Sequence, residues 1–193
     1  MALFTSPNPN VEVFHDCVYA LINCMKRNKD QRSKILDKYH LLDNKEWFSF
    51  QTWLDAFNEI SQEMGERNLF LVGVTFINKL NLSIDTSLED ALNFINIAYH
   101  CKHRIHGVNL YDSLNNKTLD GIGDYTVLEF DEVKKQAIIK STTPYPSKFD
   151  EGVIYEVARK YKPDFTRAHI ISIDKSQERR DMGGNSCTYI LTW

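Results

Sequence analysis

Pro144-Tyr-Pro-Ser-Lys-Phe-Asp-Glu-Gly152 introduces the helix around which the last third of the chain is organised. Each proline in it fixes φ and biases the residue before it away from helix, which predicts a stiff, extended approach. Ser147 and Asp150 have the spacing of a capping box, with a short acid in place of the usual glutamate, and mark a first helical turn. An apolar stripe follows at helical spacing and stops before Pro163. The stripe consists of Val153, Ile154, Val157, Ala158 and Tyr161.

Two strand-like segments precede this helix and two follow it. Residues 124–130 and 136–142 are expected to form two strands joined by a turn of acidic and basic residues. After the helix, residues 168–174 and 187–193 are expected to form two more, and the Gly183-Gly184 turn lies between them. This order predicts a ββαββ unit with an antiparallel sheet.

The first hundred residues carry helical periodicity instead. Ser49 caps one expected helix and Gly65 stops it, while Thr86 and Glu89 form the capping box of another. Helices are expected near residues 11–25, 35–39, 50–64, 69–80 and 88–99. The sequence therefore predicts an α+β fold, with N-terminal helices packed on the C-terminal ββαββ antiparallel sheet unit.

Periodicity fails between residues 105 and 123, where Asn, Gly, Asp and Lys dominate. Such a segment is typical of a long surface loop or a hinge. We expect a single α+β domain over residues 1–193, with a helical part (1–104), this loop and the ββαββ part (124–193). The residues up to Asn10 look like a loose lead-in.

Composition narrows the function classes. The chain has 193 residues, 42% of them hydrophobic and 25% charged, which is ordinary for a globular protein. A net charge of −3 provides no general attraction to nucleic acid or to anionic membranes. No secretory signal and no run of about 18 apolar residues is visible. The four cysteines show no CxxC spacing, so we expect reduced thiols and a cytoplasmic protein.

Three of the six histidines lie in the segment Tyr99-His100-Cys101-Lys102-His103-Arg104-Ile105-His106. On a helix, His100 and His103 share a side, which suits two ligands of one zinc ion or a contact with haem. His103 also continues the Leu92–Ile95–Tyr99 stripe and should point inward. Cys187 and His169 are the candidates for a third metal ligand. Alternatively, these side chains only bond the last carbonyls of the helix and favour its dipole.

A second cluster surrounds Gly183 and Gly184, where free backbone N–H groups and the nearby Arg179 and Arg180 suit an anion. A hairpin turn with solvated charges is the alternative interpretation. The sequence contains no Ser-His-Asp pattern, phosphate-binding loop or His-Glu-x-x-His motif. This favours a protein that is not an enzyme.

Four pieces of the sequence together suggest a family. They are Ala98-Tyr-His-x-x-His-Arg104, Gly121-Ile-Gly-x-Tyr125, Pro144-Tyr-Pro-x-x-Phe-Asp-x-Gly152 and Gly183-Gly-x-Ser-Cys-Thr-Tyr189. In this order they resemble bacterial signalling-associated domains of the 4-vinyl reductase-like, haem–nitric-oxide-binding and TRAPP small-subunit superfamily. The resemblance covers roughly residues 45–193 and implies helices followed by ββαββ.

The resemblance also implies a function: a small-molecule-sensing regulatory module, often dimeric, with a pocket between the helices and the sheet. Haem-binding members use a Tyr-x-Ser-x-Arg motif, and the nearest string here, Tyr111-Asp-Ser113-Leu-Asn115, has Asn in place of Arg. We expect an apolar or partly anionic ligand in the pocket. Its expected contacts are His100, His103, Arg104, Tyr145, Phe149, Gly152, Gly183 and Gly184.

Two other functions stay open. TRAPP-like relatives use this fold to pair subunits, so the chain could be a non-enzymatic scaffold or dimerisation module. The third hypothesis is a small metal-dependent enzyme that uses His100, His103 and Cys187. The expected partners are a small molecule and either a second copy of the chain or a signalling protein, with neither nucleic acid nor a membrane span.

Overall fold

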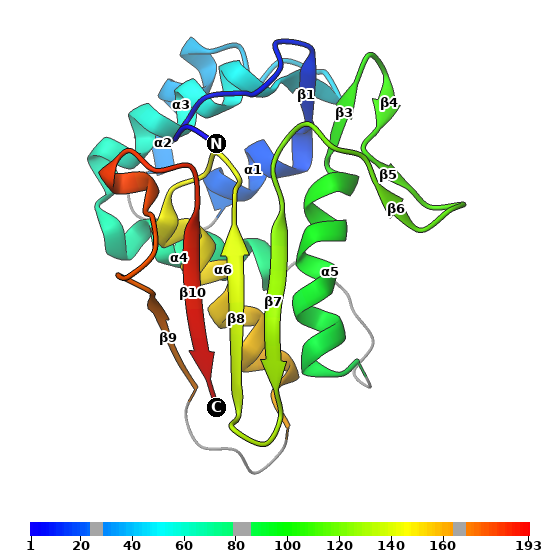
Figure 1. Ribbon diagram of the computed structural model, residues 1–193. Helices are drawn as coiled ribbons and strands as arrows, with labels where there is room; N and C mark the ends of the chain where they lie inside the picture. The colour runs from blue at the N-terminus through cyan, green and yellow to red at the C-terminus, as the bar shows by residue number, and fades with distance from the viewer. Residues whose placement is uncertain (24–28, 79–85, 164–168) are drawn as a thin grey trace.

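A computed structural model of the chain describes residues 1–23, 29–78, 86–163 and 169–193. Figure 1 shows a four-stranded sheet (β9, β10, β8 and β7) with helices behind it and a second group of strands at one end. In chain order the elements are β1 (Val11–Phe14), α1 (His15–Asn23), α2 (Lys29–Lys38), β2 (Trp47–Ser49), α3 (Phe50–Met64), α4 (Glu66–Asn78), α5 (Leu88–Cys101), β3 (His103–Ile105), β4 (Val108–Asn109), β5 (Tyr111–Asp112), β6 (Lys117–Thr118), β7 (Tyr125–Asp131), β8 (Gln136–Ser141), α6 (Ser147–Tyr161), β9 (Ile170–Ile173), the 3-10 helix η1 (Arg180–Met182) and β10 (Cys187–Thr192).

The large sheet has the strand order β7-β8-β10-β9, and every pairing in it is antiparallel. Ser141 at the end of β8 stands opposite both Tyr125 of β7 and Cys187 of β10. Side chains alternate along these strands, as expected for a sheet with one covered face. The buried residues that alternate along β8 and β10 are Ala137, Ile139, Ser141, Cys187, Tyr189 and Leu191, and Thr188 at the start of β10 is buried as well. The predicted ββαββ unit and the α+β fold are confirmed.

A second four-stranded sheet of shorter strands, with the order β2-β1-β3-β4, and a two-stranded sheet of β5 and β6 correct two predictions. Residues 11–14 form a strand and not the start of a helix. The side chains of Val11 and Val13 are buried, and the strand pairs with β3 on one side and with β2 on the other. The segment 105–123 is not only loop, since it contributes to the short strands β3 to β6. Strands of two or three residues are too short to show a periodicity of their own.

The lead-in before β1 is attached to the rest of the molecule. The backbone N–H of Phe4 donates to the carbonyl of Pro144 at 2.8 Å, and the Phe4 ring packs edge-on against Phe57 at 6.0 Å between centroids. The N–H of Ser6 donates to the Gln51 side chain of α3 at 2.8 Å. These contacts hold the N-terminal residues against α3 and the start of the Pro144 segment.

Helix α3 begins and ends where the sequence predicts, with Ser49 as its N-cap and Gly65 after its last residue. The cap of α5 is one residue later than predicted: the Ser87 hydroxyl accepts from the N–H of Asp90, so Thr86 and Glu89 are not the capping pair. The predicted ends at Met25, Leu80 and Ala168 lie outside the described residues.

Helix α6 lacks the capping box predicted for it. Its N-cap is Pro146, which has no side chain to cap with. The Ser147 hydroxyl lies 3.0 Å from Sγ of Cys187, and Asp150 is fully buried among polar side chains of the sheet. The two residues that suggested a helix start therefore hold α6 to the sheet.

Two glycines allow α4 and α6 to cross in direct backbone contact. A Cβ placed on Gly73 would lie 2.1 Å from the carbonyl oxygen of Phe149, and one on Gly152 would lie 2.1 Å from that of Phe70. Real Cβ atoms never come this close to an oxygen, so the crossing requires glycine on both helices.

One cluster of buried apolar side chains includes residues of α1, α3, α4, α5, α6 and the large sheet. Within the described ranges, no helix combines the length and the apolar character that crossing a membrane requires.

Candidate functional site

His103 is the central residue of the candidate site. Helix α5 ends at Cys101, and His103 opens β3, where it stands opposite Val13. Its side chain still folds back onto the helix, because Nδ1 lies 2.7 Å from the carbonyl oxygen of Tyr99. The residue is 1% exposed. His103 therefore points inward, as its place on the α5 stripe predicted.

The contact with Tyr99 fixes the tautomer of His103. A backbone carbonyl only accepts hydrogen bonds, so Nδ1 carries the proton and donates it. Burial lowers the pKa of His103 to about 3, so the ring is neutral near pH 7. Its other nitrogen, Nε2, is buried and has no hydrogen-bond partner among the described residues. Nε2 is thus an unused acceptor inside the protein.

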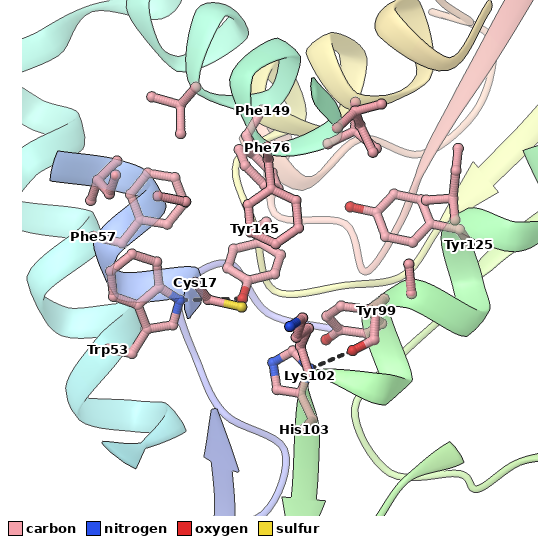
Figure 2. A pocket seen from close by; sticks show the side chains of 17 residues that line it. Cys17, Trp53, Phe57, Phe76, Tyr99, Lys102, His103, Tyr125, Tyr145 and Phe149 are labelled. Carbon is pink, nitrogen blue, oxygen red and sulfur yellow. Dashed lines mark hydrogen bonds between the residues drawn. The ribbon is translucent and has the colours of Figure 1, made fainter. Parts of the chain in front are cut away.

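An apolar cavity of about 40 Å³ adjoins His103. Figure 2 shows His103 at its lower edge, Trp53 and Phe57 on one side, and Tyr99 and Tyr125 on the other. The walls come from α1, α3, α4, α5, α6, the start of β7 and the Pro144 segment. The lining residues are Cys17, Ala20, Leu21, Trp53, Phe57, Val72, Phe76, Ile77, Ile95, Ala98, Tyr99, Lys102, His103, Tyr125, Tyr145, Phe149 and Val153.

Aromatic rings form the walls of the cavity. Trp53 and Phe57 are stacked at 5.4 Å between centroids, and Tyr145 and Phe149 lie 5.0 Å apart. Nε1 of Trp53 donates to the Tyr145 hydroxyl at 3.2 Å. Rings at this helical spacing are typical of a hydrophobic core. Trp53 and Phe57 belong to the buried core and line the cavity as well.

The remaining tyrosine hydroxyls of the lining also have partners. Tyr99 donates to the carbonyl of Ile122 at 2.7 Å, and Tyr125 donates to the Asp150 carboxylate. Burial raises the pKa of Tyr99, Tyr125 and Tyr145 well above the usual value, so all three stay neutral. The cavity wall is therefore uncharged apart from Lys102, whose ammonium lies 3.0 Å from Asp16.

His100 lies apart from the cavity. Its Nδ1 is 2.8 Å from the carbonyl of Asn96, and its Nε2 is 3.6 Å from the carboxylate of Asp124. Both ring nitrogens thus face protein partners, although the residue is as buried as His103. The two histidines, expected on one side of a helix, have separate surroundings because the helix ends between them.

The residues expected with them around a ligand divide into two groups. Tyr145 and Phe149 line the cavity with His103, so the Pro144 segment and the end of α5 do meet. Arg104 does not reach it: its guanidinium bonds the Glu12 carboxylate at 2.6 and 3.1 Å and covers the Trp47 ring.

Gly152 serves the helix crossing, and Gly183 and Gly184 lie outside the lining. Gly183 ends η1 with a φ of 86°. The arginines expected to attract an anion there have protein partners: Arg179 pairs with Asp181, and Arg180 with Asp150. The turn is therefore held within the protein by its own ion pairs.

A cysteine-containing metal site does not form around His103. Cys187 lies between the Ser147 hydroxyl at 3.0 Å and the backbone N–H of Arg180 at 3.4 Å. In the part of the chain that the structure describes, no three His, Cys, Asp or Glu side chains gather as metal ligands. The expected set of His100, His103 and Cys187 is dispersed because β10 presents Cys187 to the start of α6.

A buried ion pair next to the cavity was not predicted from the sequence. Arg180 of η1 and Asp150 of α6 are both fully buried and bonded to each other. Arg180 also donates to the carbonyls of Ser141 and Thr143 at 3.2 and 2.6 Å, and Ser141 donates to Asp150 at 2.8 Å. Tyr125 touches both this network and the cavity.

Asp150 and Arg180 each stabilise the charged form of the other. Burial raises the pKa of the Asp150 carboxyl, while Arg180 and the hydroxyl donors oppose that rise. Asp150 in turn raises the pKa of Arg180 against the effect of burial. A signal existed in the sequence, because Asp150 precedes Val153, Ile154 and Val157 on the same stripe of α6. A lone acid on an apolar stripe indicates a buried partner.

The pKa of His103 predicts how stability depends on pH. Since its pKa falls from 6.5 to about 3 on folding, the unfolded chain binds the proton more readily between these values. Stability therefore decreases as pH falls below 6.5, by about 1.4 kcal/mol per unit from this residue. Between pH 7.5 and 5, we expect the wild type to lose about 2 kcal/mol more than His103→Phe. Urea unfolding at both pH values measures this; equal losses would contradict a buried, neutral imidazole.

No protein-family model matches the chain, and no curated protein does either. A solved structure described by the words "Modulating Heme Redox Potential Through Protein-Induced Porphyrin Distortion" superimposes with a TM-score of 0.59 at 11% identity, over 93% of this chain and 99% of the other. An oxygen-binding H-NOX domain related to soluble guanylate cyclases, in its oxygen complex, superimposes with a TM-score of 0.56 at 12% identity, over 92% and 93%. At such identities the likeness shows the fold, which is that of H-NOX domains, and the resemblance had predicted it.

Proposed function

We propose that this chain is a small-molecule-binding regulatory module, whose ligand occupies the apolar cavity at His103 between the helices and the ββαββ sheet. One observation carries the proposal: Nε2 of His103 is a buried acceptor without a described partner, beside a cavity with a mostly apolar lining. Buried polar atoms are nearly always bonded, so one left over at a cavity is a reason to expect a ligand. The H-NOX fold supports a sensor, since an oxygen-binding domain has it.

Haem was one expected cofactor, and the residues at the cavity do not fit it. His103 offers a suitable nitrogen, but pockets for drug-sized ligands measure about 300–1,000 Å³ and this cavity measures about 40 Å³. The rings of Phe76, Tyr145 and Phe149 line the cavity and pack against one another, with Phe149 6.0 Å from Phe76 and 5.0 Å from Tyr145 between centroids. Lys102, the single cation among the described lining residues, is already paired with Asp16.

The other features expected of a haem site are missing from the cavity too. Tyr111 and Asn115, in the string nearest to the haem-binding motif, belong to the β5–β6 hairpin and do not line the cavity. Tyr111 instead donates to the Asn116 side chain at 2.9 Å. Zinc fits no better, because His103 supplies one nitrogen where a zinc site needs three or four protein ligands.

Xenon tests the proposal, because apolar cavities bind this gas without any specific chemistry. In ¹H–¹³C spectra of methyl-labelled protein, we expect xenon pressure to shift the methyl groups of Leu21, Val72 and Val153, which line the cavity. Ala20→Leu, which adds three carbons to the wall, should remove at least about nine-tenths of that response. Ala2→Leu makes the same change at an exposed position and should leave it unchanged.

A wild-type protein whose cavity methyl groups ignore xenon would contradict the proposal. So would an Ala20→Leu variant that stays folded and responds as the wild type does. The expected cytoplasmic location, the single-domain organisation over residues 1–193 and a homodimer or signalling partner remain predictions. Light scattering during size exclusion measures the oligomeric state directly.

A further inference from the structure

We infer that the ligand of this cavity is a neutral molecule of about three or four non-hydrogen atoms that presents one O–H or N–H donor to Nε2 of His103. The inference rests on the proposed function and adds the chemical class of the ligand. It follows from the cavity size, the tautomer of one imidazole and the partners of the surrounding polar groups.

The size limit comes from the cavity volume. A buried water needs about 10–15 Å³ of cavity volume. The cavity at His103, with about 40 Å³, therefore has room for about three or four non-hydrogen atoms. An apolar cavity of about 150 Å³ holds benzene, which sets a clear upper bound for this smaller one. The ligand class is therefore that of short alcohols and similar small molecules.

The donor requirement comes from His103 itself. Because Tyr99 holds the proton on Nδ1, Nε2 presents a lone pair and can only accept. A bound carboxylate would set its own lone pairs against that of Nε2, and would lose its hydration beside a single lining cation, Lys102, that is already paired with Asp16. A neutral hydroxyl or amine hydrogen satisfies Nε2 without either cost. The partly anionic ligand expected from the sequence is thus disfavoured.

Water is a poor occupant of the same position. A buried water forms about two to four hydrogen bonds. The hydroxyls of Tyr99 and Tyr125 donate elsewhere, and that of Tyr145 accepts from Trp53. Each of these hydroxyls thus already has one partner, whereas Nε2 of His103 has none among the described residues, and most of the other lining atoms are apolar. A molecule with one donor and an apolar body matches this better.

Ethanol and acetonitrile form a matched pair of probes for the test. Both have three non-hydrogen atoms, but only ethanol has a hydrogen to donate. We expect ethanol to bind about fivefold more tightly, as one net hydrogen bond provides. It should also shift the ¹⁵N resonance of His103 Nε2 in long-range ¹H–¹⁵N spectra. Acetonitrile should perturb the cavity methyl groups with little effect on Nε2.

The outcomes separate this inference from the proposed function. If xenon binds and the two probes bind equally with Nε2 unmoved, the donor requirement is wrong and the cavity function stands. Binding of xenon but of neither probe overturns the inference as well. A one-to-one haemin complex with an absorption band that disappears in His103→Phe would also overturn it. If xenon itself fails to bind, the proposed function fails.

The variant His103→Phe tests whether Nε2 of His103 is the group that accepts the ligand's hydrogen bond. It keeps a ring at the position and removes the acceptor, so the fivefold preference for ethanol should fall to about one. Retained acetonitrile binding would show that the variant is folded around its cavity. If the variant is unfolded, the wild-type comparison of the two probes and the Nε2 shift still decide the matter.

Discussion

Replacing Arg180 with methionine is expected to lower the free energy of unfolding by about 3–5 kcal/mol, because it leaves the Asp150 carboxylate buried without its cation. Arg180 and Asp150 have no exposed side-chain surface. Arg180 also donates to the carbonyls of Ser141 and Thr143, which would lose those donors. Urea unfolding of the variant and the wild type at pH 7 measures the loss.

Arg179→Met is the matched control for this prediction. Arg179 is the neighbouring residue, and its guanidinium bonds the Asp181 carboxylate at 3.0 Å, but both side chains reach solvent. Exposed pairs contribute little, so no measurable change is expected. Adding Asp150→Leu to Arg180→Met should restore part of the lost stability, since an apolar pair carries no unpaired charge. Equal losses for Arg179→Met and Arg180→Met would contradict the assignment.

Gly152→Ala is expected to destabilise the protein by about 2–3 kcal/mol, although alanine is the better helix former. The new methyl group would meet the carbonyl oxygen of Phe70 at 2.1 Å, and α4 would have to move away from α6. Because Phe76 of α4 and Phe149 of α6 both line the cavity, ligand binding should weaken in parallel. Chemical denaturation and the xenon titration measure the two effects.

The sign of the Gly152→Ala effect is informative by itself. In a helix without such a contact, Gly→Ala stabilises by roughly 0.5–1 kcal/mol. A more stable variant would therefore show that the helices are not in backbone contact. Gly73→Ala tests the same crossing from the other helix, where the methyl group would meet the carbonyl of Phe149.

The ββαββ unit could be predicted because each of its elements has a local signal. The strands of 124–193 alternate or are β-branched, the prolines at 144 and 146 separate β8 from α6, and Gly183-Gly184 separates β9 from β10. Helix α3 was predicted at both ends for the same reason, since Ser49 and Gly65 act within one turn of it. Elements whose position depends on interactions between near neighbours in the chain could therefore be predicted from the sequence.

Strand β1 could not be predicted, because its deciding interactions are distant. Val11 and Phe14 have helical spacing with Val18, so the pattern fits a helix as well as a strand. What selects the strand is pairing with β2 and with β3, about 35 and 90 residues away along the chain. The ion pair of Asp150 and Arg180 was missed for a similar reason, since 30 residues separate them.

The candidate site was predicted in part. The α5 stripe indicated that His103 points inward, and the Pro144 segment supplies Tyr145 and Phe149 to the same cavity. The separation of His100 from His103 depends on the helix ending at Cys101, and helix ends are hard to place within two residues. The aromatic walls gave no distinct signal, because rings that line a small cavity also serve as core.

Diffraction from a crystal of this protein under xenon pressure would show whether the cavity at His103 takes up a ligand. We expect one strong xenon peak among His103, Tyr145 and Phe149, and no such peak in crystals of Ala20→Leu. The absence of any xenon peak there in the wild type would contradict the claim that this cavity is a binding site, as would a peak confined to the protein surface.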